Sequence, residues 1–352
     1  MFFINGIGLI SPQKTSETKE FLTEIIEYHA DYLKCIEPVY RTYIDPIASR
    51  RMSRLIKMGI ASARMSVAEA GLDMPDAIIT GTGLGSVEDT EKILAEITKE
   101  ERFLNPTPFI QSTYNTISSQ VAINLKCMNY NSTYVHRTFS FESGLIDGML
   151  QMEEGAASDV LIGAIDQMTL NHLKITRRIG LWKMQPVNSL QLNDEKTPGA
   201  LAGEGAAFFV IGAKPVTSTY CKLTDAGIWI NFNGSLNITT AVEEFLGKHG
   251  LTPGDIDIVM LGNNGDSNYD FLYANFADQL FPGTAQAWYK HLCGEYHTAT
   301  GFGLWAAANI LKHQSYPEIL HLNGILPSRK KNILIYNQYR NVNHAMTLVQ
   351  AC

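Results

Sequence analysis

The chain has 352 residues, of which 45% are hydrophobic and 18% charged, and its net charge is -7 at pH 7. This composition is typical of a globular protein with a large core, and the length favours two domains or one domain of two fused halves. The negative charge argues against general nucleic-acid binding, because neutralising phosphates requires an excess of lysine and arginine.

The cysteines and the apolar segments indicate the cellular compartment and whether the chain is a metal-binding, disulfide-bonded or membrane protein. An odd number of cysteines, none in a C-x-x-C pair, indicates neither a zinc site nor a disulfide framework and predicts a reducing compartment. The apolar start, MFFINGIGLISPQ, lacks a basic segment, so we interpret it as a buried strand and not as a signal peptide. No run approaches the roughly 18 apolar residues of a membrane span. We therefore expect a cytoplasmic protein, and no metal or cofactor is predicted. The cysteines are at positions 35, 127, 221, 293 and 352.

In chain order, short apolar runs alternate with amphipathic helical stretches. This alternation predicts an α/β fold with largely buried sheets. The predicted strands are 2–10, 76–85, 132–139, 159–166, 206–213, 256–264, 318–324 and 332–337. The predicted helices are 50–70, 86–99, 143–154, 241–249 and 303–313.

The chain also contains an internal echo. Segments 61–94 and 241–272 both read as helix, Gly-Leu, short acidic connection, strand, glycine-rich turn and helix. Gly71 and Gly250 occupy the position after a helix that glycine favours. The echo predicts a duplicated α/β unit. We expect halves at 1–212 and 213–352, with a turn-rich linker within 212–240.

The stretch HRTFSFESGL, residues 136–145, follows a strand-type run and leads into a helix. Enzymes often place a nucleophile at such a corner, because the free N–H groups and the helix dipole favour negative charge. This corner has no cysteine. It holds Phe139, Ser140, Phe141 and Glu142.

Five segments, in order, resemble the β-ketoacyl synthase family, the condensing enzymes of the thiolase fold. They are FFINGIGLISPQ at 2–13, the alanine-rich stretch at 44–72, ITGTGLGSVEDTEKIL at 79–94, the segment at 105–135 and GALAGEGAAFFVIGA at 199–213. The resemblance implies a five-layer αβαβα fold made of two halves, and dimers. It also implies condensation of acyl groups delivered by an acyl carrier protein, with a cysteine nucleophile, two histidines and a supporting lysine and glutamate.

The family's nucleophile motif, cysteine followed by two residues and glycine, aligns best with Phe141 in the cysteine position. A small shift places Ser140 there instead, and a serine needs a nearby general base. We expect Phe139 and Phe141 to fill the acyl tunnel as large apolar side chains.

Both histidine positions also differ. The first falls on Gly262, beside Asn263 and Asn264, whose amides can contact a polar ligand but cannot act as general bases. The second, five residues after Lys290, falls on Glu295. We predict a buried ion pair between Lys290 and Glu295. His297 lies two residues further, and using it would break the lysine spacing.

The family ends with a Gly-Phe-Gly-Gly turn that gates the tunnel. This chain has Tyr339, Arg340, Asn341 and Val342, which we expect not to adopt the same positive φ angles cheaply. The resemblance therefore points to a degenerate member of the chain-length-factor class, which pairs with an active ketosynthase in type II fatty acid or polyketide systems, including aryl polyene and flexirubin-type pigments.

Two alternatives stay open. One is an active synthase or acyltransferase that uses Ser140 or Cys293, with Lys290 and Glu295 in support. The other is a homodimeric scaffold for the acyl carrier protein. Carrier proteins are acidic, and two basic stretches offer docking faces for them. These stretches contain Arg50, Arg51, Arg54 and Lys57, and Arg329, Lys330 and Lys331.

Overall fold

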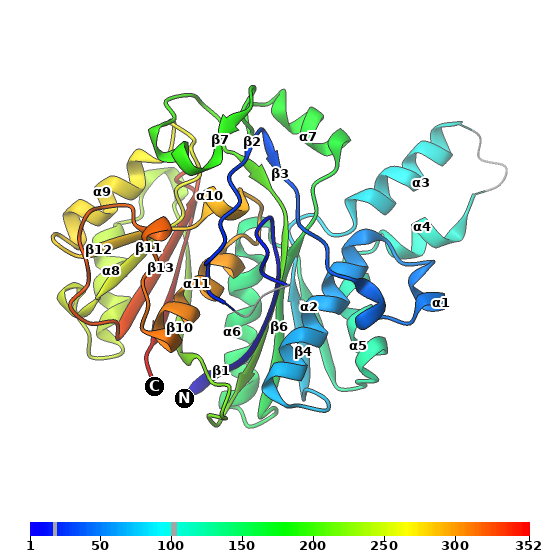
Figure 1. Cartoon of the computed structure of the whole chain (residues 1–352), viewed down its shortest axis with the longest axis horizontal. Helices are drawn as coiled ribbons and strands as arrows, with labels where there is room; N and C mark the ends of the chain where they lie inside the picture. Colours follow the sequence, from blue (N-terminus) through cyan, green and yellow to red (C-terminus); the bar gives the residue numbers. More distant parts are fainter. Residues whose placement is uncertain (17–19, 100–103) are drawn as a thin grey trace.

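The computed structural model describes residues 1–16, 20–99 and 104–352 (Figure 1). Ten strands form a hydrogen-bonded sheet in the order β12-β11-β13-β14-β10-β1-β9-β6-β4-β5. They are β1 (Phe2–Ile10), β4 (Ala77–Gly81), β5 (Tyr130–Tyr134), β6 (Asp159–Asp166), β9 (Gly205–Gly212), β10 (Cys221–Ile230), β11 (Ile258–Leu261), β12 (Ala285–Trp288), β13 (Asn332–Tyr339) and β14 (Asn343–Gln350). Two short pairings lie apart from it, β2 (His29–Ala30) with β7 (Val187–Asn188) and β3 (Tyr32–Leu33) with β8 (Ala202–Gly203).

The helices connect and cover these strands. Gly71 ends α2 with a φ of 69°, and Gly250 follows α8 with a φ of 68°, as the sequence predicts. The helices are α1 (Pro46–Ser49), α2 (Arg54–Ala70), α3 (Val87–Lys99), α4 (Pro106–Gln111), α5 (Thr116–Leu125), α6 (Ser140–Glu153), α7 (Leu170–Arg177), α8 (Ile238–Gly247), α9 (Phe271–Leu280), α10 (Lys290–Cys293) and α11 (Thr300–His313).

The sheet consists of two five-stranded units with the same topology. In β5-β4-β6-β9-β1, the first three strands are parallel and the last two pair antiparallel. The unit β12-β11-β13-β14-β10 repeats this pattern. The units meet where Phe2–Ile4 of β1 pairs with Cys221–Leu223 of β10. The predicted α/β architecture of two similar halves is therefore present.

The layers follow from which helix faces are apolar. Helices α6 and α11 lie between the two units, and their apolar side chains form one core cluster with both (Figure 1). Helices α2 and α5 cover the outer face of the first unit, and α8 and α9 cover that of the second. Gly8 in β1 lets α2 approach closely, since a Cβ there would lie 1.9 Å from the carbonyl oxygen of Ser62.

Two predicted segments differ from the structure. The range 212–240, predicted to hold a turn-rich linker, also contains the unpredicted strand β10 at the junction of the two units. This strand has one partly exposed face, so its sequence is not a continuous apolar run, and the turn residues on both sides make the whole range look like a linker. The predicted strand 318–324 instead begins with a 3-10 turn, η6 (Glu318–Leu320). The predicted division after residue 212 falls at the end of β9, and its status as a domain boundary stays a prediction.

None of the helices in the described residues is long and apolar enough to cross a membrane.

Arg54, predicted to lie on an exposed docking face, instead faces inward. Its guanidinium contacts both carboxylate oxygens of Glu204, at 2.8 Å for the Nη1–Oε2 pair, and also contacts Glu37. The Glu204 side chain is fully buried and also accepts hydrogen bonds from the backbone N–H groups of Cys35 and Met168. The arginine of the basic stretch and the glutamate of the Gly-Glu-Gly motif therefore hold α2, β3 and β8 together.

We expect Glu204→Ala to lower the free energy of unfolding by roughly 3–5 kcal/mol, because it removes the buried carboxylate of Arg54, which keeps only the more exposed Glu37, and leaves two backbone N–H groups without an acceptor. Urea unfolding of the purified chain measures this. Lys92→Ala removes the exposed pair with Glu88 and is the matched control, expected to change stability by about 0.5 kcal/mol or less. Equal effects of the two substitutions would contradict a structural role for Glu204.

Candidate functional site

The corner between strand β5 and helix α6 is closed by backbone contacts. A 3-10 turn, η2 (Arg137–Phe139), joins them, and Arg137 has a left-handed backbone with a φ of 48°. The fully buried Ser140 hydroxyl accepts a hydrogen bond from His136 N at 2.9 Å. It lies 2.7 Å from Arg137 O and 3.0 Å from Thr82 O, and donates to one of them. The contacts recorded for Ser140 Oγ are all to backbone atoms, so none of them is to a general base.

The two phenylalanines of the corner are core residues. Phe141 lies between the two sheet units, with its ring centre 5.7 Å from that of Phe209. Phe139 is equally buried, 5.4 Å from the ring of His136. Neither lines the cleft or the smaller inner cavity beside it, both of which are formed by other described residues. Their predicted position along an acyl tunnel stays a prediction.

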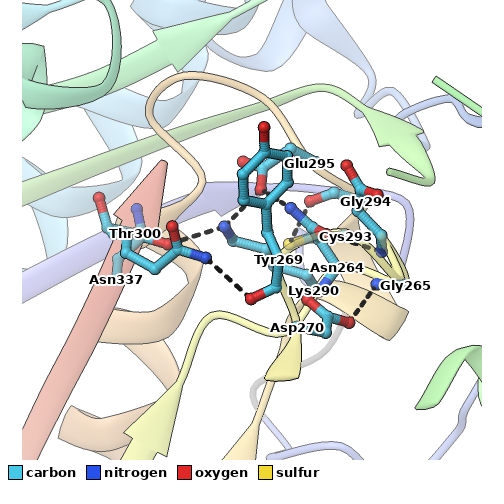
Figure 2. Close-up of polar contacts among 12 residues, drawn as sticks. Asn264, Gly265, Tyr269, Asp270, Lys290, Cys293, Gly294, Glu295, Thr300 and Asn337 are labelled. Carbon is cyan, nitrogen blue, oxygen red and sulfur yellow. Dashed lines mark hydrogen bonds and ion pairs between the residues drawn. The ribbon is translucent and has the colours of Figure 1, made fainter. Parts of the chain in front are cut away.

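The predicted ion pair between Lys290 and Glu295 is confirmed. Figure 2 shows Lys290 directed at Glu295 and Asn337, with Nζ–O distances of 2.6 and 2.8 Å. Lys290 is fully buried and Glu295 nearly so. The amide of Asn264 donates to the same Glu295 oxygen at 2.6 Å. The lysine and the glutamate are thus fixed by each other and by two amides from separate loops and strands.

Gly262, which takes the first histidine position, has no room for a side chain. A Cβ there would lie 2.3 Å from Asn337 Oδ1 and 2.7 Å from the Tyr273 hydroxyl. Asp270 shapes the following turn by accepting from the N–H groups of Asn264 and Gly265, at 3.1 and 2.8 Å. Burial raises the pKa of Asp270 to about 6, against these hydrogen bonds.

The turn predicted to stand in place of the family's glycine-rich gate adopts the costly positive φ angles at two residues. Arg340 and Asn341 have φ values of 53° and 57° in the hairpin between β13 and β14. The Gln338 side chain accepts from Asn341 N at 2.8 Å, and the Arg340 guanidinium lies 5.4 Å from the centre of the Tyr269 ring. These contacts compensate the conformational cost of a positive φ, which is small for glycine and larger for other residues.

A cleft opens beside this turn. It brings together residues of both halves, including the predicted Asn264, Glu295, His297 and Tyr339. Gly262, Ser140 and Cys293 do not line it. The lining residues are His172, Leu181, Trp182, Ala200, Asn264, Asp266, Tyr269, Glu295, Tyr296, His297, Gln338, Tyr339 and Arg340.

His297 and Cys293 are the two remaining candidates for a catalytic side chain, and burial affects both. Burial lowers the pKa of His297 to about 4, so its imidazole is neutral at pH 7. It packs against Gly83, where a Cβ would lie 2.2 Å from that of the histidine. Cys293 is fully buried, and burial raises the pKa of its thiol well above the usual value. A buried thiol with a raised pKa is a poor nucleophile.

Two buried carboxylates near the cleft were missed by the sequence analysis. Asp166, at the end of β6, accepts from Thr82, Gly83 and Leu84 through one oxygen and from Thr298 through the other. It joins loops of the two halves on either side of His297. Burial raises its pKa to about 6. The sequence does contain a hint of this role, because an aspartate at the end of a buried apolar strand needs hydrogen-bond partners.

Glu142 is the second. One of its oxygens accepts from the Thr300 hydroxyl at 2.7 Å, where the N-termini of α6 and α11 meet. The other is buried without a hydrogen-bond partner, and burial raises the pKa of this carboxyl to about 7. A protonated glutamate satisfies this environment better than an ionised one.

Comparisons with known proteins agree with this geometry. Residues 30–173 match the family described as "Beta-ketoacyl synthase, N-terminal domain". No curated protein matches the sequence. A beta-ketoacyl synthase from Burkholderia phymatum STM815 has a TM-score of 0.81 at 13% identity, and the ishigamide ketosynthase/chain length factor one of 0.79 at 16%. The ketosynthase ApeO in complex with its chain length factor ApeC from Xenorhabdus doucetiae has a TM-score of 0.77 at 13% identity. Each match covers 100% of this chain and 98–99% of the other. The predicted thiolase-like fold is confirmed.

The raised pKa of Glu142 predicts a pH dependence of stability. A carboxyl with a raised pKa in the folded state stabilises the fold below its unfolded pKa, and this contribution is lost as pH rises from about 4.5 to about 7. We therefore compare the free energy of unfolding of Glu142→Gln with that of the wild type. We expect this difference to be about 1–3 kcal/mol more favourable to the variant at pH 8 than at pH 5.

Urea unfolding of both proteins at the two pH values checks this. Asp166 and Asp270 titrate in an overlapping range, so the difference between variant and wild type is the informative quantity. An identical pH dependence in both would show that Glu142 is ionised throughout.

Proposed function

We propose that this protein is a non-catalytic, chain-length-factor-like subunit, because residues 30–173 match the beta-ketoacyl synthase N-terminal domain and the whole chain has the thiolase-like fold of ketosynthases. It would pair with an active ketosynthase in a type II fatty acid or polyketide pathway. The observation that carries the proposal is the filled space at Gly262.

Condensation requires a thiolate that holds the acyl chain and groups that stabilise the developing enolate. The corner offers only a serine hydroxyl engaged by backbone atoms. At the two histidine positions stand a glycine without space for a side chain and a glutamate paired with Lys290. Glu295 can neutralise the lysine but provides no imidazole N–H for an oxyanion. The chemistry therefore belongs to a partner subunit.

The alternative, an active synthase or acyltransferase that uses Ser140 or Cys293, has weaker support. Cys293 points its Sγ at the carbonyl oxygen of Gly294, 3.3 Å away, and it does not line the cleft. Phe139 and Phe141 instead suit a structural role, because fully buried rings next to the corner would close a tunnel that arrives from a partner.

The proposed partner surface is the edge of the first sheet unit. Strand β5 is the terminal strand of the sheet, and an unpaired edge can accept a strand from another chain. Apolar side chains beside it are exposed: Ile123 by 68%, Met128 by 95% and Tyr130 by 43%. Together they form the β5 edge surface, which suits association with a ketosynthase or with a second copy.

Docking of an acyl carrier protein remains part of the proposal. Arg50 and Arg51 are exposed at the start of α2, and Lys57 is partly exposed. Arg54 is excluded by its pairing with Glu204. In the second basic stretch, Arg329 already pairs with Asp257 at 2.9 Å. The pair Arg50–Arg51 is therefore the better candidate for an acidic partner.

Incubation of the purified chain with acyl-carrier thioesters, followed by intact-mass spectrometry, tests the absence of catalysis. We expect no stoichiometric acyl adduct, since Ser140 and Cys293 are buried and have no activating base. The control is a ketosynthase with a cysteine nucleophile, which acylates under the same conditions. An adduct mapped to Ser140 or Cys293 would refute the non-catalytic assignment.

Association is tested by co-expression with the ketosynthase encoded nearest in the genome. We expect a heterodimer, and expect Ile123→Asp combined with Met128→Asp to abolish it, because two charges would be buried in an apolar contact. Phe232→Asp is the matched control, since Phe232 is 70% exposed and lies in the second half. A stable homodimer that ignores the ketosynthase would favour the scaffold alternative.

A further inference from the structure

A carboxylate lies in contact with the β5 edge surface. Asp147 of α6 is only 7% exposed. It accepts from the Tyr130 hydroxyl at 3.1 Å through one oxygen and from the Gln151 amide at 3.3 Å through the other. Burial and, after it, the charge of Asp147 raise the pKa of the Tyr134 hydroxyl to about 12. Because Tyr130 is part of the β5 edge surface, a partner that covers this tyrosine also covers the carboxylate.

The charge of Asp147 has no cationic partner in the part of the chain that the structure describes. None of the ion pairs there includes Asp147. Lys126, the cation that precedes β5, is exposed at the end of α5. A carboxylate can accept about four hydrogen bonds, and only two side-chain donors contact this one. It therefore retains the capacity for a charged donor.

Association through this surface would remove the remaining water from Asp147. Leu150, one turn further along α6, is 48% exposed and continues the apolar surface on the other side of the carboxylate. An ionised group that is buried without a counter-charge costs several kcal/mol. A symmetric homodimer buries the same patch on both chains, so it incurs this cost twice. A different partner can supply a cation and avoid the cost.

We propose that the partner at the β5 edge surface presents a lysine or arginine to Asp147, and that this contact favours a heterodimer over a homodimer. The inference rests on the proposed subunit role and deepens it, because it states which chemistry the partner carries. An unpaired carboxylate then acts against self-association, and the same carboxylate attracts the correct partner.

Sedimentation velocity of the chain alone tests the effect on self-association. Asp147→Asn removes the charge and keeps an acceptor for Tyr130, so we expect the variant to self-associate at least about tenfold more tightly than the wild type. Asp147→Glu keeps the charge and is expected to resemble the wild type. Glu153→Gln is the matched control, since it neutralises an exposed carboxylate at the end of the same helix. Equal self-association of Asp147→Asn and the wild type would overturn the inference, whether or not a ketosynthase binds.

Titration with the ketosynthase encoded nearest in the genome tests the other half. We expect Asp147→Asn to bind it at least about tenfold more weakly, because the partner's cation loses its counter-charge. Opposite changes in the two affinities identify the charge effect, since a structural disturbance would weaken both associations. An unchanged or tighter heterodimer would refute the inference.

A wild-type chain that binds no ketosynthase would count against the proposed function, and the self-association result then decides this inference alone. Thermal melting shows whether each variant is folded. Asp147→Ala, which is also neutral, takes the place of Asp147→Asn if the latter does not fold, with the same expected results.

Discussion

The buried ion pair between Lys290 and Glu295 is the constraint on which the site depends. An ammonium without a partner in this interior would cost several kcal/mol, so the carboxylate at position 295 is needed for the lysine to remain charged. The pair also recruits Asn264 from the loop after β11 and Asn337 from β13. The carboxylate of Glu295 therefore gives the cleft a rigid wall whose charge is neutralised by Lys290.

Much of the fold could be predicted because its signals are local. Short apolar runs bounded by glycine gave most of the strands, and the echo between 61–94 and 241–272 reported the repeated topology. Strand β10 was missed because its partly exposed face and flanking turn residues resemble a linker. Its role as the junction depends on pairing with β1, two hundred residues earlier in the chain. Such pairings have no local signature.

The site was harder to predict, because its properties depend on distance and burial. The spacing of five residues sufficed for the ion pair, since one helical turn followed by a glycine brings the two charges together. The role of Asp166 follows from its contact with Thr298, more than a hundred positions away in the sequence. The role of Glu142 follows from its contact with Thr300 on another helix. For Arg340, the sequence indicates that a positive φ is costly, but it does not reveal the contacts of the turn with Gln338 and Tyr269 that compensate this cost.

The contact around Gly262 also bears on how this lineage can change. Asn337 and Tyr273 occupy the volume that an imidazole would need, and both are tied to Lys290 or to each other by hydrogen bonds. A histidine gained at position 262 by a single mutation would meet a clash before it gave any benefit. For the subunit proposed above, gaining an imidazole at this position would therefore require Asn337 and Tyr273 to change together with residue 262.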